Sequence, residues 1–225
     1  MRLERRGDVP LHMIALAPLG AVVAALALSG VLIALAGVSP LVAYGEMLRG
    51  AFGSRLSITE TLTRATPLIL TGLAAAVAFR ARLWNIGGEG QFYLGALAAA
   101  WVGHGMLSGL PVPLAVAVLL VAGMAAGALL LAGPAFLRLR FGVDEVVTTL
   151  LLNFIVLLFV GMMIEGRLRD PLAFGWPQSV PVDDELMLGK LVARTRLHMG
   201  LVIAIAAAGV VWLIQARTVF GLETR

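Results

Sequence analysis

The chain has 225 residues, of which 60% are hydrophobic and 13% are charged. A water-soluble domain is nearer half apolar and a quarter charged, and a chain of this length could not bury so many apolar side chains in one core. The net charge is +4, because 17 Lys and Arg residues exceed 13 Asp and Glu residues. The basic residues are scattered along the chain, so nucleic acid is not an expected partner. The composition therefore excludes a soluble globular protein and predicts an all-α, polytopic helix bundle in a lipid bilayer.

Apolar segments long enough to cross a bilayer recur along the chain. A spanning helix needs about 20 apolar residues. The first segment follows a basic start, but its apolar run is much longer than the roughly 7–15 residues of a signal-peptide core, so we expect it to be retained. We predict one transmembrane domain over residues 1–225, with about six spans at 11–36, 62–79, 91–107, 112–136, 146–164 and 198–215.

The distribution of basic residues predicts the orientation of these spans. Lys and Arg accumulate in short cytoplasmic loops, and the connection 104–111 contains neither. A cytoplasmic N-terminus therefore fits best, with 37–61 and 165–197 on the outer side. We interpret 165–197 as an external excursion rather than a span. The residues that this orientation places inside are Arg2, Arg5, Arg6, Arg80, Arg82, Arg138, Arg140, Arg217 and Arg225.

Signatures of enzymatic chemistry are missing from the sequence. It contains no cysteine, no H-E-x-x-H, no G-x-S-x-G and no phosphate-binding G-x-x-x-x-G-K-[ST]. The three histidines, His12, His104 and His198, are far apart and lie near the ends of predicted helices. We therefore expect no catalytic site, no metal site and no cofactor in this chain.

One predicted span carries a polar stripe. An ionisable group at the bilayer centre costs about 2.5–3.5 kcal/mol, so such groups usually face a protein interior or a water-filled cavity. In "DEVVTTLLLNFIVLLF" (144–159), Glu145, Thr149 and Asn153 follow one another at i, i+4 and i+8 on one helix face, which we expect to point inward. Hydrogen bonding between helices would also explain Thr149 and Asn153, and the helix dipole would explain Glu145.

A second polar cluster interrupts the apolar pattern at "FRARLWNIGGEGQFYLGA" (79–96), where Asn85, Glu89 and Gln91 lie among glycines. These side chains could belong to an ordinary helix end at the membrane surface, where Glu89 and Gln91 satisfy free N–H groups of the next span. Alternatively, the glycines permit a broken or re-entrant segment at 80–91 that presents the polar side chains to a solute. The helix-breaking glycines would be Gly87, Gly88 and Gly90.

Two strings of the sequence are characteristic of a known family. "RATPLILTGLAAAVAFRARLWNIGGEGQFYLGALAAA" (64–100) and "FGVDEVVTTLLLNFI" (141–155) resemble the membrane permease subunit of bacterial ATP-binding cassette (ABC) importers. The branch that they resemble handles nucleosides and simple sugars and is related to the ribose and branched-chain amino acid permeases.

The resemblance implies a transport function and a set of partners. We expect a multi-pass subunit of the bacterial cytoplasmic (inner) membrane that forms the path for a nucleoside or simple sugar. Its partners would be a second permease subunit, ABC ATPase subunits that bind the ATP, and an extracytoplasmic solute-binding protein. The residues that the resemblance assigns to the substrate path are Asn85, Glu89, Gln91, Thr149 and Asn153.

Two points remain open from the sequence. One alternative function is a secondary transporter or channel that needs no ATPase, and another is a purely structural membrane scaffold in which the polar stripe only joins helices. The family pattern also continues beyond a segment that resembles "ARTVFGLETR" (216–225) into a stretch that docks in the ATPase and then into further spans. The resemblance therefore implies that the chain is C-terminally truncated relative to the family.

Overall fold

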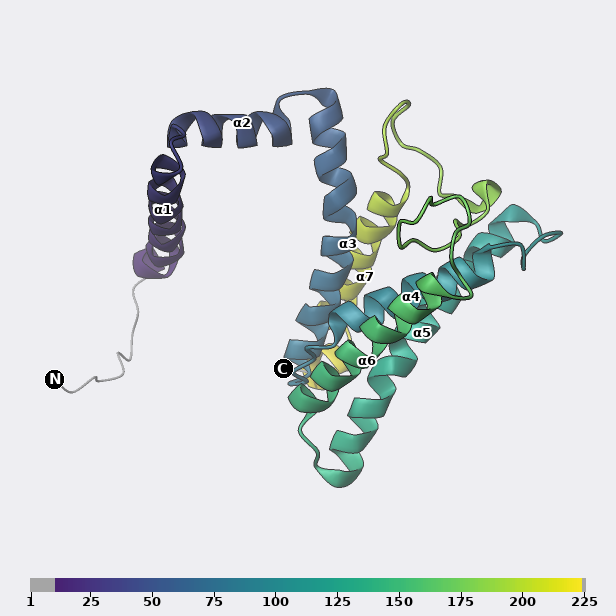
Figure 1. Cartoon of the computed structure of the whole chain (residues 1–225). Coiled ribbons are helices and arrows are strands. Elements are labelled where there is room, and N and C mark those ends of the chain that lie inside the picture. The colour runs from purple at the N-terminus through teal and green to yellow at the C-terminus, as the bar shows by residue number, and fades with distance from the viewer. Residues whose placement is uncertain (1–10, 224–225) are drawn as a thin grey trace. The chain divides into compact units, whose positions relative to one another are not determined.

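The computed structural model describes residues 11–223, and the chain divides into two compact units, Met1–Thr61 and Leu62–Arg225. The described residues form helices and irregular connections, without a strand. Figure 1 traces the helices in chain order from α1 to α7. The all-α prediction is confirmed.

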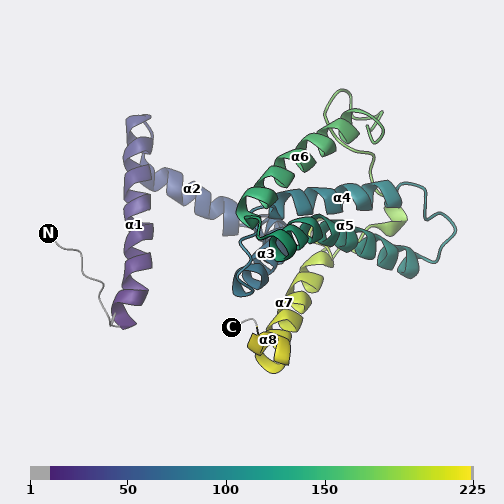
Figure 2. The same cartoon turned by 90° about the horizontal axis from the view of Figure 1, so that it is seen from below.

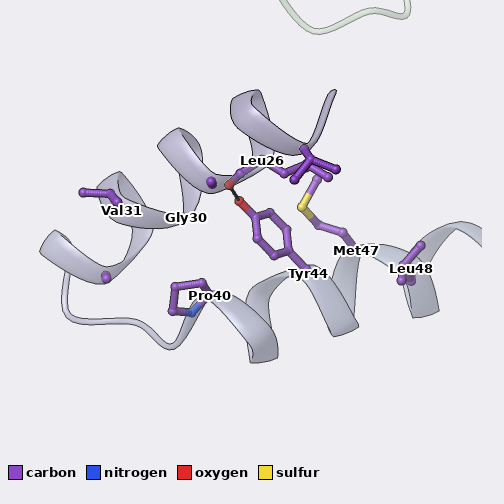
Figure 3. Close-up of a pocket in the computed structure, with 10 residues that line it drawn as sticks. Leu26, Gly30, Val31, Pro40, Tyr44, Met47 and Leu48 are labelled. Carbon is purple, nitrogen blue, oxygen red and sulfur yellow. Dashed lines mark hydrogen bonds between the residues drawn. The ribbon is translucent and has the colours of Figure 1, made fainter. Parts of the chain in front are cut away.

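The first unit contains two helices, α1 (Leu11–Leu35) and α2 (Pro40–Phe52). A turn through Gly37, whose φ is +81°, separates them, and Pro40 provides the first residue of α2, a position where its missing N–H costs nothing. The hydroxyl of Tyr44 on α2 donates to the carbonyl of Leu26 at 2.6 Å. An apolar hollow of about 770 Å³ lies beside this contact (Figure 3).

Helix α3 (Arg55–Arg80) begins in the first unit and continues into the second. Its start is stabilised by Ser54, whose hydroxyl accepts a hydrogen bond from the N–H of Ser57 at 3.0 Å, as expected for a capping serine. The predicted span began only at residue 62, because the seven residues before it include polar and charged side chains. The helix nevertheless begins at Arg55, so these residues add about two turns.

The second unit is built around three packed helices, α4 (Gly88–Gly103), α5 (Val112–Phe141) and α6 (Glu145–Glu165), which lie together in both views (Figures 1 and 2). Helices α4 and α5 approach closely at Gly95 and Gly123, where a Cβ added to Gly95 would lie 3.0 Å from the Gly123 carbonyl oxygen. Small residues permit such an approach between membrane helices. One apolar cluster comprises Leu97, Val156, Val160, Met163, Leu168 and Val180.

Helix α7 (Gly200–Arg217) runs in the same direction as α3. At one end, a Cβ added to Gly200 would lie 3.5 Å from the Thr66 side chain. At the other end, the Arg80 guanidinium donates to the side-chain oxygen of Gln215 at 3.0 Å. A short helix, α8 (Val219–Glu223), follows.

The long connection between α6 and α7 folds back over the α4–α5 connection. It contains the 3-10 helix η1 (Asp184–Leu186) and two isolated bridges, Arg169–Ser179 and Lys190–His198. The Asp183 N–H donates to the Gly103 carbonyl at 3.0 Å, and the Gly105 N–H donates to the Asp183 carboxylate at 3.1 Å. The predicted excursion at 165–197 is therefore an ordered element without a membrane helix.

Among the described residues, five helices are long and apolar enough to cross a membrane, namely α1 from residue 16, α3, α5, α6 and α7. By length and composition, these helices are candidates for membrane spans. The predicted span 91–107 corresponds to α4, whose 16 residues are fewer than the about 20 that a perpendicular span needs. Helix α5 extends past the predicted end at 136 to Phe141, where Gly142 (φ +66°) terminates it.

Candidate functional site

The site begins where α3 ends in a Schellman motif. The Leu83 N–H donates to the Ala78 carbonyl at 2.9 Å, and the Arg82 N–H donates to the Phe79 carbonyl at 3.0 Å, the two bonds that define this termination. Arg82 occupies the left-handed position with φ +55°, where glycine is usual. The chain then leaves the helical path until α4 begins at Gly88.

This break exposes backbone N–H groups that the polar stripe of α6 satisfies. Glu145, Thr149 and Asn153 are 8%, 2% and 6% exposed, so the predicted inward orientation is confirmed. Each stripe residue accepts a hydrogen bond from the 84–90 backbone. The pairs are Trp84 N–H to Glu145 Oε1 (3.3 Å), Ile86 N–H to Thr149 Oγ1 (3.2 Å) and Gly90 N–H to Asn153 Oδ1 (2.5 Å).

Two of the three predicted glycines are required by close contact with α6. A Cβ added to Gly87 would lie 2.9 Å from the Thr149 carbonyl oxygen, and one added to Gly90 would lie 2.9 Å from Asn153 Oδ1. A Cβ added to Gly88 would meet nothing within 4 Å. The glycines therefore let the broken segment lie directly on α6, and Gly87 and Gly90 carry this role.

A charged contact joins the two turns at the same end of the unit. The Arg138 guanidinium near the end of α5 forms an ion pair with Glu145 and donates to the Arg82 carbonyl at 2.9 Å. The neighbouring Asp144 caps α6 by accepting from the Val146 N–H at 2.8 Å. Arg138 thus ties the α3–α4 break to the α5–α6 turn.

The polar side chains of the broken segment itself, on Asn85, Glu89 and Gln91, make a different set of contacts. The Asn85 amide donates to the side-chain oxygen of Gln91 at 3.2 Å, and its own oxygen accepts from the Gly87 N–H at 3.0 Å. Glu89 accepts a long contact of 3.5 Å from the Asn153 amide. Asn85, Glu89 and Gln91 are therefore brought together at the start of α4.

Two hollows lie beside α3 and this segment, and α5 also lines the first of them. The first, of about 540 Å³, is bordered by Asn85 and Gln91 and by the facing part of α3 at Thr71. The second, of about 490 Å³, is bordered by Asn85, Glu89 and Thr71. Apolar side chains form most of both walls, and a few convergent polar groups in an apolar cavity are typical of small-molecule sites.

The structure thus separates the predicted site residues into two groups. Asn85, Glu89 and Gln91 border the hollows, whereas Thr149 and Asn153 border neither of these two and bond to the backbone and side chains of the broken segment. Direct contact of Thr149 and Asn153 with a solute stays a prediction.

Some residues that line this region were not predicted from the sequence. Thr71 borders both hollows, and Phe92 supplies an aromatic wall to each. Both lie in apolar helices, and the hydrophobic pattern gives no signal for which face of each helix borders the hollows. Arg138 was assigned only to a cytoplasmic flank, because a basic residue after a span is expected there.

Metal ligation has no geometric basis in the described part of the chain. Across these residues no group of three or more His, Asp or Glu side chains is arranged to hold a metal ion. The site offers amide, hydroxyl and carboxylate groups instead. Such groups can exchange hydrogen bonds with a polar solute.

Comparison with known proteins places this chain in a family. Residues 57–225 match the family model described as branched-chain amino acid transport system / permease component. The chain is 34% identical over 233 residues to a glucose ABC transporter permease protein of Haloferax volcanii, covering 99% of this chain and 60% of the relative. It is 34% identical over 211 residues to a guanosine ABC transporter permease protein of Bacillus subtilis, covering 93% and 60%.

A third relative is a nucleoside ABC transporter permease protein of Lactococcus lactis, 31% identical over 225 residues, with 93% of this chain and 59% of the relative covered. No solved structure matches the chain. The chain spans about 60% of the length of these curated relatives. Because the family model covers the broken segment and the polar stripe together, the chain belongs to the family of branched-chain amino acid transport system permease components.

Proposed function

We propose that this chain is part of the membrane subunit of an ATP-driven ABC importer and contributes to the translocation path for a nucleoside or simple sugar. The family membership and the names of the relatives support the proposal. A glucose and a guanosine permease protein are equally identical to the chain, at 34%. The identities therefore favour neither solute class.

The observation that carries the proposal is the division of the polar residues. Thr149 and Asn153 are buried and hold the broken segment, whereas Asn85, Glu89 and Gln91 border the hollows beside α3 and α4. Interhelical hydrogen bonding alone explains the first group. It does not explain why the second group lies beside open space.

The chemistry of the hollows fits passage rather than tight retention. The amides of Asn85 and Gln91 each offer donors and an acceptor, which suits the hydroxyl groups of a sugar or the edge of a base. They already bond to each other at 3.2 Å, so a solute would exchange one hydrogen bond for another at little net gain. High affinity would then reside in the extracytoplasmic binding protein that delivers the solute.

The partners follow from the proposed importer. ATP would be bound and hydrolysed by separate ATPase subunits, with no cofactor in this chain, and a second permease subunit would complete the path. Arg80, Arg82 and Arg138 lie at one end of the second unit, linked through the Arg138–Arg82 and Arg80–Gln215 contacts. The positive-inside rule assigns this end to the cytoplasm, which agrees with a cytoplasmic N-terminus in a bacterial inner membrane.

ATP-dependent uptake tests this proposal. Cells expressing the full-length permease with its ATPase and binding protein should accumulate radiolabelled guanosine or glucose, and an ATPase variant that cannot hydrolyse ATP should abolish uptake. Asn85→Ala and Glu89→Ala should reduce uptake while the ATPase still copurifies, whereas Leu158→Ala, at a 77% exposed position of α6, should transport normally. Uptake that persists without ATP hydrolysis would instead indicate a secondary transporter or channel.

A further inference from the structure

A separate polar hollow lies at the opposite end of α6. It has a volume of about 450 Å³ and is formed by Ile164, Glu165, Arg169, Gly175, Trp176 and Pro177. Polar atoms supply most of its wall, in contrast to the hollows beside α3. Glu165 is 20 residues from Glu145 on the same helix, so the two ends are about 30 Å apart.

The loop that forms one wall is held by its own hydrogen bonds. The Asp170 N–H donates to the Gln178 carbonyl at 3.1 Å, and the Gln178 amide donates to the Asp170 carboxylate at 2.9 Å. Ala173 anchors the loop, since it is 7% exposed. Positive φ values at Phe174 (+48°) and Gly175 (+95°) then reverse the chain. The result is a closed turn of fixed shape.

This turn presents an aromatic face at the hollow. The Trp176 side chain is on a residue that is 77% exposed although it lies on an ordered loop, and the backbone N–H of Trp176 donates to the Ala173 carbonyl at 2.9 Å. An indole in this position offers a flat apolar surface, on which a base or the apolar face of a sugar ring can stack.

Two opposite charges border the same hollow. Glu165 ends α6 and Arg169 follows it, and both are exposed. Within the described residues, neither the Glu165 carboxylate nor the Arg169 guanidinium has a hydrogen-bond or ion-pair partner. The helix ends at Glu165 with Gly166 as its C-cap, so Arg169 lies outside the helix and the two side chains do not share a helix face. Both are therefore available to a ligand, one as acceptor and one as donor.

We propose that this hollow is a low-affinity binding site for a polyhydroxylated ring compound, a sugar or a nucleoside. The ring stacks on Trp176, the Glu165 carboxylate accepts hydrogen bonds from ring hydroxyls, and the Arg169 guanidinium donates to hydroxyl or base oxygens. The choice of solute class rests on the proposed function. The site itself is distinct from the hollows beside Asn85 and Gln91.

Saturation-transfer NMR with the full-length permease in nanodiscs, without ATPase or binding protein, tests the site. Guanosine and glucose are titrated separately, and 2′,3′-dideoxyguanosine tests the hydroxyl contacts. Trp176→Ala should raise the dissociation constant at least about fivefold, because stacking on an aromatic side chain carries much of such binding, and Trp176→Phe should restore most of it. Glu165→Gln and Arg169→Gln should each weaken binding. Leu172→Ala, in the same turn but outside the hollow, is the matched control.

The outcomes separate this proposal from the transport proposal. Binding of guanosine alone or of glucose alone, lost in Trp176→Ala, supports the site and identifies its solute. Three results would overturn it. The first is equal binding in the wild type and Trp176→Ala, and the second is no binding of either solute. The third is binding that is removed by Gln91→Ala but not by Trp176→Ala. None of these three results bears on ATP-dependent uptake.

Discussion

The side-chain oxygen of Asn153 accepts a hydrogen bond from the backbone N–H of Gly90, which is 63 residues earlier in the chain, at 2.5 Å. Asn153 is 6% exposed, so no water is expected to replace this bond. The contact fixes the first turn of α4 on α6. It thereby fixes the positions of Glu89 and Gln91 on either side of Gly90.

The first prediction concerns Gly90. In Gly90→Ala the new methyl group would lie 2.9 Å from Asn153 Oδ1 and 3.2 Å from Asn153 Cα, and α6 cannot yield without moving its backbone. We expect a loss of about 1–3 kcal/mol, measured as a lower thermal unfolding midpoint in detergent. Gly88→Ala is the matched control, because its methyl group meets nothing within 4 Å. Equal destabilisation by both substitutions would contradict the contact.

A second prediction concerns the hydroxyl of Thr149. Thr149→Val keeps the shape of the side chain but leaves the Ile86 N–H without its acceptor. The Ile86 N–H is only partly buried, so we expect a loss near the lower end of the about 1–3 kcal/mol that an unsatisfied buried donor costs, and the unfolding midpoint should fall. Thr149→Ser retains the oxygen and should lose less. If Val and Ser variants are equally stable, the hydroxyl does not hold the broken segment.

The ion pair between Arg138 and Glu145 gives a third prediction. The Glu145 side chain is 11% exposed and the Arg138 side chain 36%, so Arg138→Gln leaves a nearly buried carboxylate without its partner. We expect a loss of about 2 kcal/mol. In the double variant Arg138→Gln/Glu145→Gln part of this loss should be recovered, because no unpaired charge remains. Additive losses in the cycle would show that the two side chains do not interact.

Arg82 provides a stabilising substitution. Its left-handed conformation costs an L-residue roughly 1–2 kcal/mol, and the interaction that the structure uses is its backbone carbonyl, which accepts from Arg138. Arg82→Gly keeps that carbonyl and relieves the strain, so we expect a gain of up to about 1 kcal/mol. Ala81→Gly, at the adjacent residue without a positive φ, should not stabilise the protein. A lower midpoint for Arg82→Gly would refute the explanation.

The sequence was sufficient to predict the inward stripe and the position of the break. Glu145, Thr149 and Asn153 recur at helical spacing among apolar residues, and this period determines which residues share a face. The break was indicated by three glycines within four positions. Both signals are local, so they could be read without knowledge of the packing.

The pairing between these two elements could not be read in the same way. The spacing predicts that the stripe faces the interior. However, the hydrogen bonds that Asn153 accepts from Gly90 and Thr149 accepts from Ile86 join residues that are more than sixty positions apart in the sequence. Thr71 is likewise identified only by its place in the walls of the two hollows. Helix α2 was not predicted as a span, because it has only 13 residues and these include Glu46 and Arg49.

The central claim is that polar side chains at the start of α4 border a water-accessible route, and thiol labelling tests it most directly. The sequence contains no cysteine, so Gln91→Cys and Leu158→Cys each introduce one thiol into this chain. In the full-length permease in membranes, a charged, water-soluble thiol reagent should modify Gln91→Cys, and the transported solute should slow that reaction. Leu158→Cys, at a 77% exposed position in an apolar stretch of α6, should remain unmodified. Gln91→Cys that reacts no faster than Leu158→Cys would contradict the claim.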